Sequence, residues 1–253
     1  MSSMNTRRIH VGVGGWTFAP WRDNFYPAGL PHARELEYAS RQLTAIEVNG
    51  TYYSTFKPDT FAKWRDQAPL DFVFTLKAHR FATTRKVLAE AGEPIRRFVG
   101  SGITQLGSRL GPIVWQFMPT KKFDAADFEA FLRLLPPEAD GLPLQHVLDV
   151  RHPSFDCDAY LELARRYRCI TVHTDSDKYP QIADAGSDIA YLRLMRSQPD
   201  CPTGYPEAAL QQWAQGARAW LGKGADRRVF AFFINGAKER APAAAQAFLH
   251  HFR

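Results

Sequence analysis

Two acidic residues in this chain could carry acid–base chemistry. Glu47 lies in the apolar run Thr44–Val48, and Asp149 lies in the run Gln145–Val150. Two carboxyl groups in one site can serve as general acid and general base when their surroundings separate their pKa values. We expect Glu47 and Asp149 to be the catalytic residues. The alternative is that each carboxylate only neutralises a neighbouring cation.

Three cationic residues end or follow other apolar runs, namely Lys77, Arg151 and Arg193. A guanidinium group matches a carboxylate or phosphate in bidentate geometry, so these residues predict a small anionic ligand. Lys77 could also form a Schiff base if burial lowered its pKa, but no sequence feature indicates a lowered pKa.

Further substrate-binding candidates are polar and aromatic residues at or near the ends of apolar runs. Amide groups could orient a ligand, and an indole or phenol ring could stack on a sugar or base. We expect His152 to reach back from a loop, because a regular strand would turn it away from Arg151. The remaining candidates are Trp16, Asn49, Tyr52, Gln116, Asp175 and Asn235.

Metal and nucleotide sites have weaker support. Carboxylates and imidazoles could be assembled into a divalent-metal site from Glu47, Asp149, His152, His173 and Asp175. No H-E-x-x-H motif accompanies them, and we predict no metal and no cofactor. The glycine-rich segment 12–17 lacks the third glycine of a dinucleotide fingerprint, and neither a phosphate-binding loop nor a G-x-S-x-G motif occurs.

Eight short apolar runs predict the strands that position these residues. They are Ile9–Gly14, Thr44–Val48, Phe72–Lys77, Ile113–Phe117, Gln145–Val150, Cys169–Thr174, Ile189–Leu194 and Val229–Ile234. Helical patterns between them include Pro58–Gln67, Phe123–Leu135 with Asp124 as its cap, Asp158–Tyr167, Pro206–Leu221 and Ala241–Phe252. This alternation over residues 1–253 predicts one α/β domain, a (β/α)₈ TIM-type barrel of parallel strands. We expect Asp175–Gly186, after the sixth strand, to be irregular. A doubly wound sheet is the alternative.

The alternation of side chains within each strand predicts which residues line the barrel. We expect the bulkier apolar set to face the helices, including Val11, Val13, Ile46, Phe74, Trp115, Leu148, Ile170, Val172, Leu192, Phe230, Phe232 and Ile234. The opposite set then points inward and ends in a polar group in seven of the eight strands. Polar groups at the carboxyl ends of strands are typical of the catalytic mouth of a TIM barrel. This inward set comprises Glu47, Asn49, Thr75, Lys77, Gln116, Asp149, Arg151, His173, Asp175, Tyr191, Arg193 and Asn235, with Gly14 and Trp16 on the first strand.

Several short motifs are spread along the chain. They are Gly12-x-Gly14-Gly15-Trp16, Phe25-Tyr26-Pro27, Ile46-Glu47-Val48-Asn49-x-Thr51-Tyr52-Tyr53, Lys77-Ala78, Leu110-Gly111-Pro112 with Gln116, Arg151-His152-Pro153-Ser154, Arg193-Leu194 and Phe233-x-Asn235. With them the chain resembles the YecE-like family, catalogued as domain of unknown function 72, over nearly its whole length. The resemblance implies a TIM-type barrel and no particular reaction. The chain departs from the family pattern with Asp149 in place of Glu, at Thr83-Thr84, at Met195-Arg196 and at Ala244.

Composition places the chain among globular proteins. Hydrophobic residues make up 45% and charged residues 23%, which excludes a disordered, collagen-like or coiled-coil chain. Three cysteines without C-x-x-C spacing suit a reducing compartment. The N-terminus shows no signal peptide, and no apolar run approaches the ~20 residues of a membrane span. We therefore expect a cytoplasmic protein without a membrane partner.

The net charge bears on the partners. Lys plus Arg exceed Asp plus Glu by 32 − 26 = 6, a moderate excess that permits an anionic partner without requiring one. We predict an enzyme acting on a small polar, anionic substrate. Hydrolysis, isomerisation and elimination all fit, and hydrolysis is favoured only because it is common. The alternative is a non-catalytic protein that binds nucleic acid or an anionic metabolite. The sequence leaves the oligomeric state open.

Overall fold

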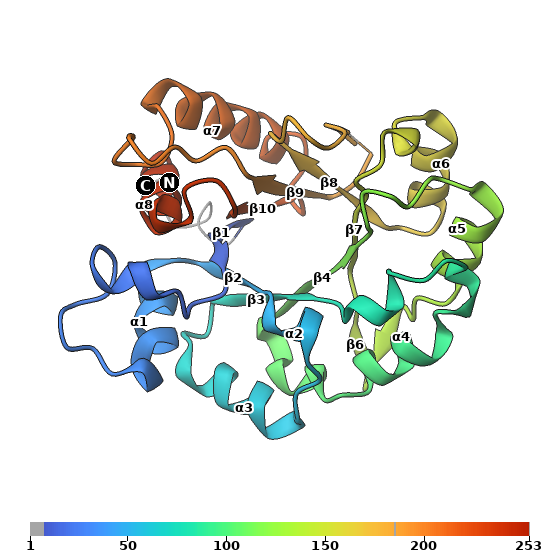
Figure 1. Cartoon of the computed structure of the whole chain (residues 1–253), viewed down its shortest axis with the longest axis horizontal. Coiled ribbons are helices and arrows are strands. Elements are labelled where there is room, and N and C mark those ends of the chain that lie inside the picture. The colour runs from blue at the N-terminus through green and yellow to red at the C-terminus, as the bar shows by residue number, and fades with distance from the viewer. Residues whose placement is uncertain (1–7, 185, 253) are drawn as a thin grey trace.

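The computed structural model describes residues 8–184 and 186–252. Eight parallel strands close into a barrel in the order in which they occur along the chain (Figure 1). They are β1 (Ile9–Gly14), β2 (Ala45–Val48), β3 (Val73–Lys77), β4 (Leu110–Gln116), β7 (His146–Asp149), β8 (Ile170–Thr174), β9 (Ile189–Leu194) and β10 (Arg228–Phe233). The predicted TIM-type barrel is confirmed, and each predicted strand is present.

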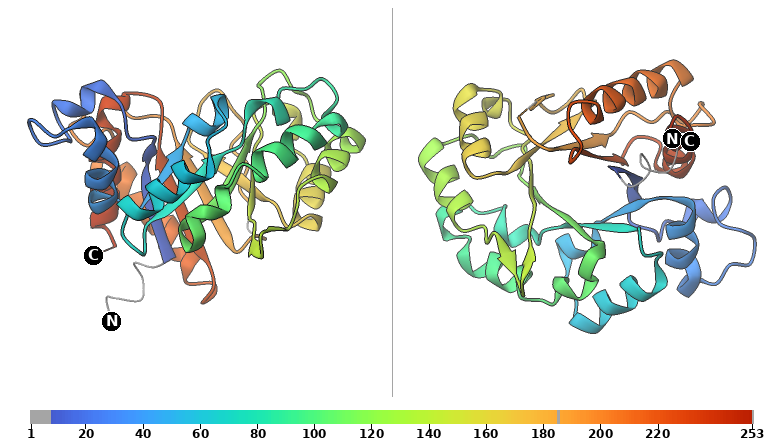
Figure 2. Two further views of the ribbon diagram at one scale, coloured as in Figure 1. Left: turned by 90° about the horizontal axis from the view of Figure 1, so that it is seen from below. Right: turned by 180° about the vertical axis from the view of Figure 1, so that it is seen from behind.

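Helices surround the barrel (Figures 1 and 2). They are α1 (Glu35–Gln42), α2 (Gly50–Tyr53), α3 (Pro58–Gln67), α4 (Gly92–Val99), α5 (Ala125–Arg133), α6 (Asp158–Arg166), α7 (Glu207–Leu221) and α8 (Ala241–His250). Helix α5 shows why they form: the Asp124 carboxylate accepts a hydrogen bond from the Asp127 amide at 2.9 Å, and Phe128 and Phe131 are buried on one face. The sequence analysis missed a short antiparallel pair, β5 (Glu138–Ala139) and β6 (Leu142–Pro143).

The connection between β8 and β9 has no helix in its described residues, 175–184 and 186–188. The predicted irregular segment is confirmed.

Across the whole described part of the chain, no helix is long and apolar enough to cross a membrane. Cys157, Cys169 and Cys201 are free thiols.

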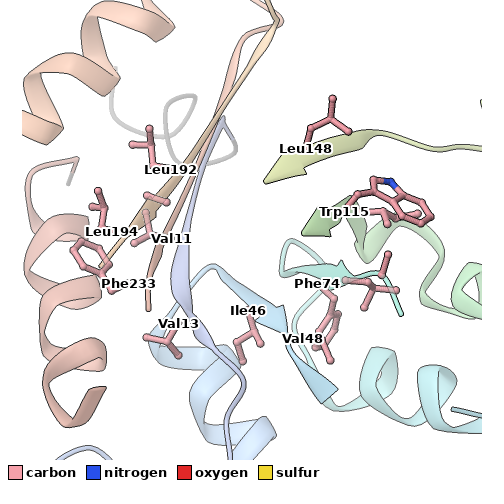
Figure 3. Close-up of a cluster of buried hydrophobic side chains, with 14 of the residues drawn as sticks. Val11, Val13, Ile46, Val48, Phe74, Trp115, Leu148, Leu192, Leu194 and Phe233 are labelled. Carbon is pink, nitrogen blue, oxygen red and sulfur yellow. The ribbon is translucent and has the colours of Figure 1, made fainter. Parts of the chain in front are cut away.

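The side chains that pack between strands and helices follow the predicted alternation in most strands. Val11, Ile46, Trp115 and Leu148 belong to one buried cluster with residues of the surrounding helices (Figure 3). Each contributes by removing apolar surface from water. The outer layer of the core therefore follows from strand parity.

The prediction of helix-facing residues is wrong for β8 and β10. Ile170, Val172, Phe230, Phe232 and Ile234 belong to a second buried cluster, formed chiefly by inward side chains of the strands. Side-chain size was a poor guide here, because the interior holds large rings beside the glycines of β1, and the His10 ring of β1 stacks on Phe230. Gly12 pairs with Phe232 in the register, and a Cβ at Gly12 would lie only 1.8 Å from the Ala45 carbonyl oxygen.

We expect Phe232→Ala to lower the free energy of unfolding by about 3–5 kcal/mol, because the ring is wholly buried and its removal leaves a cavity. Urea unfolding measures the change. Leu70→Ala is the matched control, since Leu70 is 82% exposed and its truncation should change the free energy by less than about 0.5 kcal/mol. A loss below 1 kcal/mol for Phe232→Ala would show that this ring does not fill the barrel.

Candidate functional site

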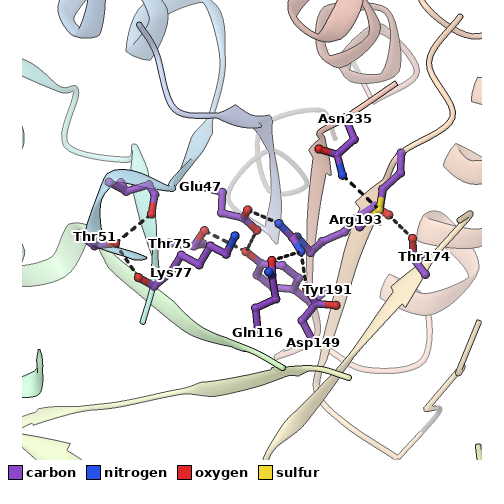
Figure 4. Close-up of polar contacts among 12 residues, drawn as sticks. Glu47, Thr51, Thr75, Lys77, Gln116, Asp149, Thr174, Tyr191, Arg193 and Asn235 are labelled. Carbon is purple, nitrogen blue, oxygen red and sulfur yellow. Dashed lines mark hydrogen bonds and ion pairs between the residues drawn. The ribbon is translucent and has the colours of Figure 1, made fainter. Parts of the chain in front are cut away.

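Arg193 is the centre of the barrel mouth. Its guanidinium group is buried between Glu47 of β2 and Asp149 of β7 (Figure 4). Nη2 donates to Glu47 Oε1 at 2.9 Å, and Nη1 donates to Asp149 Oδ2. Burial alone would lower the pKa of Arg193, but the two carboxylates raise it above its ordinary value. The three side chains form one buried ionic cluster that joins three strands.

Glu47 is held on its other oxygen as well. The Tyr191 hydroxyl donates to Glu47 Oε2 at 2.9 Å and lies 3.0 Å from Thr75 Oγ1. Because the tyrosine has a single hydroxyl proton, Thr75 must be the donor in the second bond. Burial and the neighbouring Glu47 raise the pKa of Tyr191 well above its usual range, so it stays protonated. Both carboxylate oxygens of Glu47 are thus hydrogen-bonded.

Asp149 is shared by two arginines. Arg151 donates to Asp149 Oδ2 from Nη2 at 3.0 Å, and Nη2 also donates to Gln116 Oε1 at 2.8 Å. Burial would raise the pKa of the Asp149 carboxyl, but Arg193 and Arg151 outweigh it and lower the pKa. Tyr179, from the irregular segment after β8, places its ring 4.5 Å from the Arg151 guanidinium. Tyr179 was not predicted from the sequence, because a segment without helix or strand periodicity gives no sign of where its side chains point.

Lys77 ends β3 beside this cluster. Its side chain is buried, and Nζ lies 4.3 Å from the centre of the Tyr52 ring. Within residues 8–184 and 186–252, its ammonium group has no hydrogen bond and no ion pair. Burial, followed by the charge of Arg193, lowers the pKa of Lys77 to about 8. Lys77 is therefore an amine that changes its charge near neutral pH.

Three other expected residues border the mouth without joining the cluster. A Cβ at Gly14 would lie 2.5 Å from Asn49 Nδ2, so this glycine leaves room for the amide. The Trp16 ring packs edge-on against Trp64 of α3 at 5.2 Å, which corrects the expectation that it points inward. Asn235 is exposed, and its Nδ2 lies 3.7 Å from Met195 Sδ.

His173 and Asp175 lie on the helix side of the barrel, which corrects their predicted inward orientation. His173 Nδ1 lies 3.1 Å from the Ile182 carbonyl oxygen, and its ring packs on Trp213 of α7. Asp175 accepts hydrogen bonds from the Met195 amide and the Tyr205 hydroxyl. The cause is the reversed parity of β8.

His152 lies on the loop after β7, as expected, but does not reach back. Its Nδ1 accepts a hydrogen bond from the Ser154 amide at 3.1 Å. The five ligands considered for a metal therefore do not converge. In the part of the chain that the structure describes, no three His, Cys, Asp or Glu side chains come close enough to hold an ion.

Comparisons with known proteins agree with this architecture. The family model described as "Protein of unknown function DUF72" matches residues 10–253. The UPF0759 protein YecE of Escherichia coli K12 is 26% identical over 149 residues, which are 58% of this chain. The match spans only half the length of that relative.

Two solved structures share the fold. A DUF72 family protein from Thermotoga maritima superposes with a TM-score of 0.73 at 22% identity, covering 95% of this chain and 96% of that chain. One from Enterococcus faecalis superposes with a TM-score of 0.72 at 15% identity, covering 96% and 95%. At these identities the likeness shows the fold alone.

The lowered pKa of Lys77 predicts a pH dependence of stability. In the unfolded chain the pKa of lysine is about 10.4, whereas in the folded protein it is about 8. Between these values the unfolded state binds more protons, so the free energy of unfolding rises with pH from about 8 to about 10.4. Urea unfolding at pH 7, 9 and 10.5 should show this rise in the wild type. Its persistence in Lys77→Met would assign it to another group.

Removing the central guanidinium should destabilise the protein. Arg193→Met leaves the buried Glu47 without a cation and Asp149 with Arg151 alone, and it should cost about 3–5 kcal/mol at pH 7. Adding Glu47→Gln and Asp149→Asn removes those charges and should recover part of the loss.

The pKa of Asp149 is lowered on folding. Its ionised form therefore stabilises the fold above about pH 3.9, and this stabilisation disappears as the pH falls through the folded pKa.

The difference between wild type and Arg193→Met, followed by urea unfolding, should thus shrink below pH 4. A triple variant no more stable than Arg193→Met would refute the role of charge in this loss.

Proposed function

We propose that the barrel mouth of this chain, which belongs to the DUF72 protein family, is the active site of an enzyme for a small anionic substrate. The observation that carries the proposal is Lys77, a side chain only 7% exposed whose ammonium group has no carboxylate partner in the described part of the chain. The mouth also lies where catalytic groups occur in barrels of this kind.

The charges of the mouth do not balance. Arg193, Arg151 and Lys77 face only two carboxylates, Glu47 and Asp149. Both carboxylates are already bonded to arginines, so the protonated Lys77 is the excess charge. A buried charge without a partner is costly, and a bound anion would supply that partner.

The neighbouring groups suit a carboxylate or phosphate. Arg151 lies at the edge of the cluster with its side chain 10% exposed, and its Nη1, which donates to the Tyr179 hydroxyl at 3.3 Å, keeps a second N–H for a ligand. Gln116 Oε1 accepts hydrogen bonds from Arg151 at 2.8 Å and Arg193 at 3.3 Å, which fixes the orientation of its amide. Its NH₂ group therefore points away from both arginines and can donate to a ligand.

Lys77 is also the group that we assign to proton transfer. A pKa of about 8 lets the amine accept or give a proton near neutral pH. Asp149, with its lowered pKa, is a weak base, and Glu47 is hydrogen-bonded on both oxygens. In this proposal the two carboxylates hold Arg193, and Lys77 moves the proton. Hydrolysis, isomerisation and elimination all use such a group.

We expect small anions to stabilise the wild type in a thermal-shift screen of inorganic phosphate, sugar phosphates and small carboxylates. A ligand at 100 times its Kd adds about 2.7 kcal/mol to the free energy of unfolding. Lys77→Met should abolish this effect, while Lys63→Met on the exposed face of α3 should retain it. The stabilisation should also weaken as the pH rises through about 8, because the free amine loses its charge.

A second comparison separates binding from catalysis. Lys77→Arg keeps the charge but holds its proton at neutral pH, so it should bind the anion found in the screen and lose turnover. Turnover is followed by NMR of that ligand with the wild type. Equal stabilisation of the wild type and Lys77→Met would refute the anion site, and binding without any conversion would refute the enzyme.

A further inference from the structure

We propose that three loops beside the barrel mouth form a binding surface for single-stranded nucleic acid. They follow the neighbouring strands β2, β3 and β4 and comprise residues 53–57, 78–87 and 117–123, here called the basic rim. Because the strands are parallel, these loops all lie at the carboxyl end of the barrel. This inference does not rest on the small-anion site proposed above.

The basic rim holds the charge excess of the protein. Its 22 residues include six cations and no Asp or Glu, whereas the whole chain has a net charge of +6. The remaining residues therefore sum to zero. Lys121 pairs with Asp127 of α5, and the other five make no ion pair within the described chain. The six cations are Lys57, Arg80, Arg85, Lys86, Lys121 and Lys122.

The same loops expose apolar side chains. The large hydrophobic residues that are exposed in the described chain are Tyr53 (62%), Leu70 (82%), Phe81 (56%), Val87 (43%) and Met118 (41%). All but Leu70 belong to the basic rim. Exposed apolar groups gathered in one region, among cations, are typical of an interaction site.

The two exposed aromatic rings pack against neighbouring side chains. The Phe81 ring lies 4.8 Å from the His79 ring, and His79 Nδ1 accepts a hydrogen bond from the Phe81 amide at 3.4 Å. Arg85 Nε donates to the Phe81 carbonyl oxygen at 3.0 Å. Tyr53 in turn packs edge-on against Tyr52, whose ring covers Lys77. The basic rim is thus an ordered surface that continues to the mouth.

A cavity of about 120 Å³ lies between the second of these loops and α4. Arg85 and Arg97 both line it, together with His79, Phe81 and Glu93. Two guanidinium groups outnumber the one carboxylate, so the cavity favours an anionic group such as a phosphate.

This combination selects single-stranded nucleic acid over other polyanions. Cations along a surface attract phosphates, and exposed rings stack on bases, which are accessible only when a strand is unpaired. An acidic peptide or a sulfated polysaccharide offers the charge without the planar groups. The structure therefore predicts that the rings, and not only the cations, determine the affinity.

The test is fluorescence anisotropy with labelled 12-nucleotide oligo(dT) and oligo(U), using the whole chain at 50–200 mM salt. Binding should weaken steeply with salt, with a slope of about 0.7 per phosphate contacted. Tyr53→Ala with Phe81→Ala should weaken binding roughly tenfold or more at unchanged slope. Arg80→Gln with Lys86→Gln removes two phosphate contacts and should reduce the slope by about 1.4.

Matched controls lie on other parts of the surface. Leu70→Ala removes an apolar group that is more exposed than either ring, and Lys63→Gln with Lys223→Gln removes two exposed cations. All should bind as the wild type does, as should Lys77→Met. The last result keeps this surface separate from the proposed small-anion site.

Four outcomes would overturn the proposal. The first two are no binding at 50 mM salt, and equal affinity of the wild type and the variant Tyr53→Ala with Phe81→Ala. The third is tighter binding of a duplex or of heparin than of the single strands. The fourth is displacement of the oligonucleotide by an acidic peptide of equal charge.

Discussion

The guanidinium of Arg193, buried between two carboxylates, is the constraint on which the mouth depends. Removing charges from water is costly, and the cost is offset only when the partners meet in good geometry. Glu47, Asp149 and Arg193 come from β2, β7 and β9, so that geometry exists only when the barrel is closed. Hydrogen bonds from Tyr191 to Glu47 and from Arg193 to Gln116 add to it, and among the described residues Arg193 Nε stays without a partner. The cluster therefore favours one register of the strands as well as one arrangement of charges.

This cluster also explains why Lys77 stands out. Two carboxylates are engaged by two arginines, and the third cation is left with an aromatic ring for a neighbour. Lys77 is not needed to neutralise Glu47 and Asp149, because the two arginines already do so. The irregular segment after β8 has a related consequence, because it lets Tyr179 reach the guanidinium of Arg151 where a regular helix would have carried its side chains along the outside of the barrel.

The fold depends less on particular side chains than the chemistry of the mouth does. Structures that share 15–22% of residues with this chain superpose over nearly its whole length, so the barrel tolerates wide replacement of its side chains. Barrel packing needs apolar volume in the right places, and many sequences supply it. The charged cluster and the basic rim depend instead on particular side chains at particular strand ends and loops. They are the features by which this chain can differ in function from others of the same fold.

The strands, their order and the outer face of most of them could be predicted from the amino-acid sequence, because period-two alternation is a local property of the chain. The sequence also selected Glu47, Lys77, Asp149, Arg151 and Arg193 as neighbours. Only the folded barrel shows which way β8 and β10 face, and hence that His173 and Asp175 leave the mouth. It also pairs both carboxylates with Arg193 and, among the described residues, leaves Lys77 without an ion pair. The physical reason is that burial and charge pairing depend on distances across the closed barrel, which no local pattern contains.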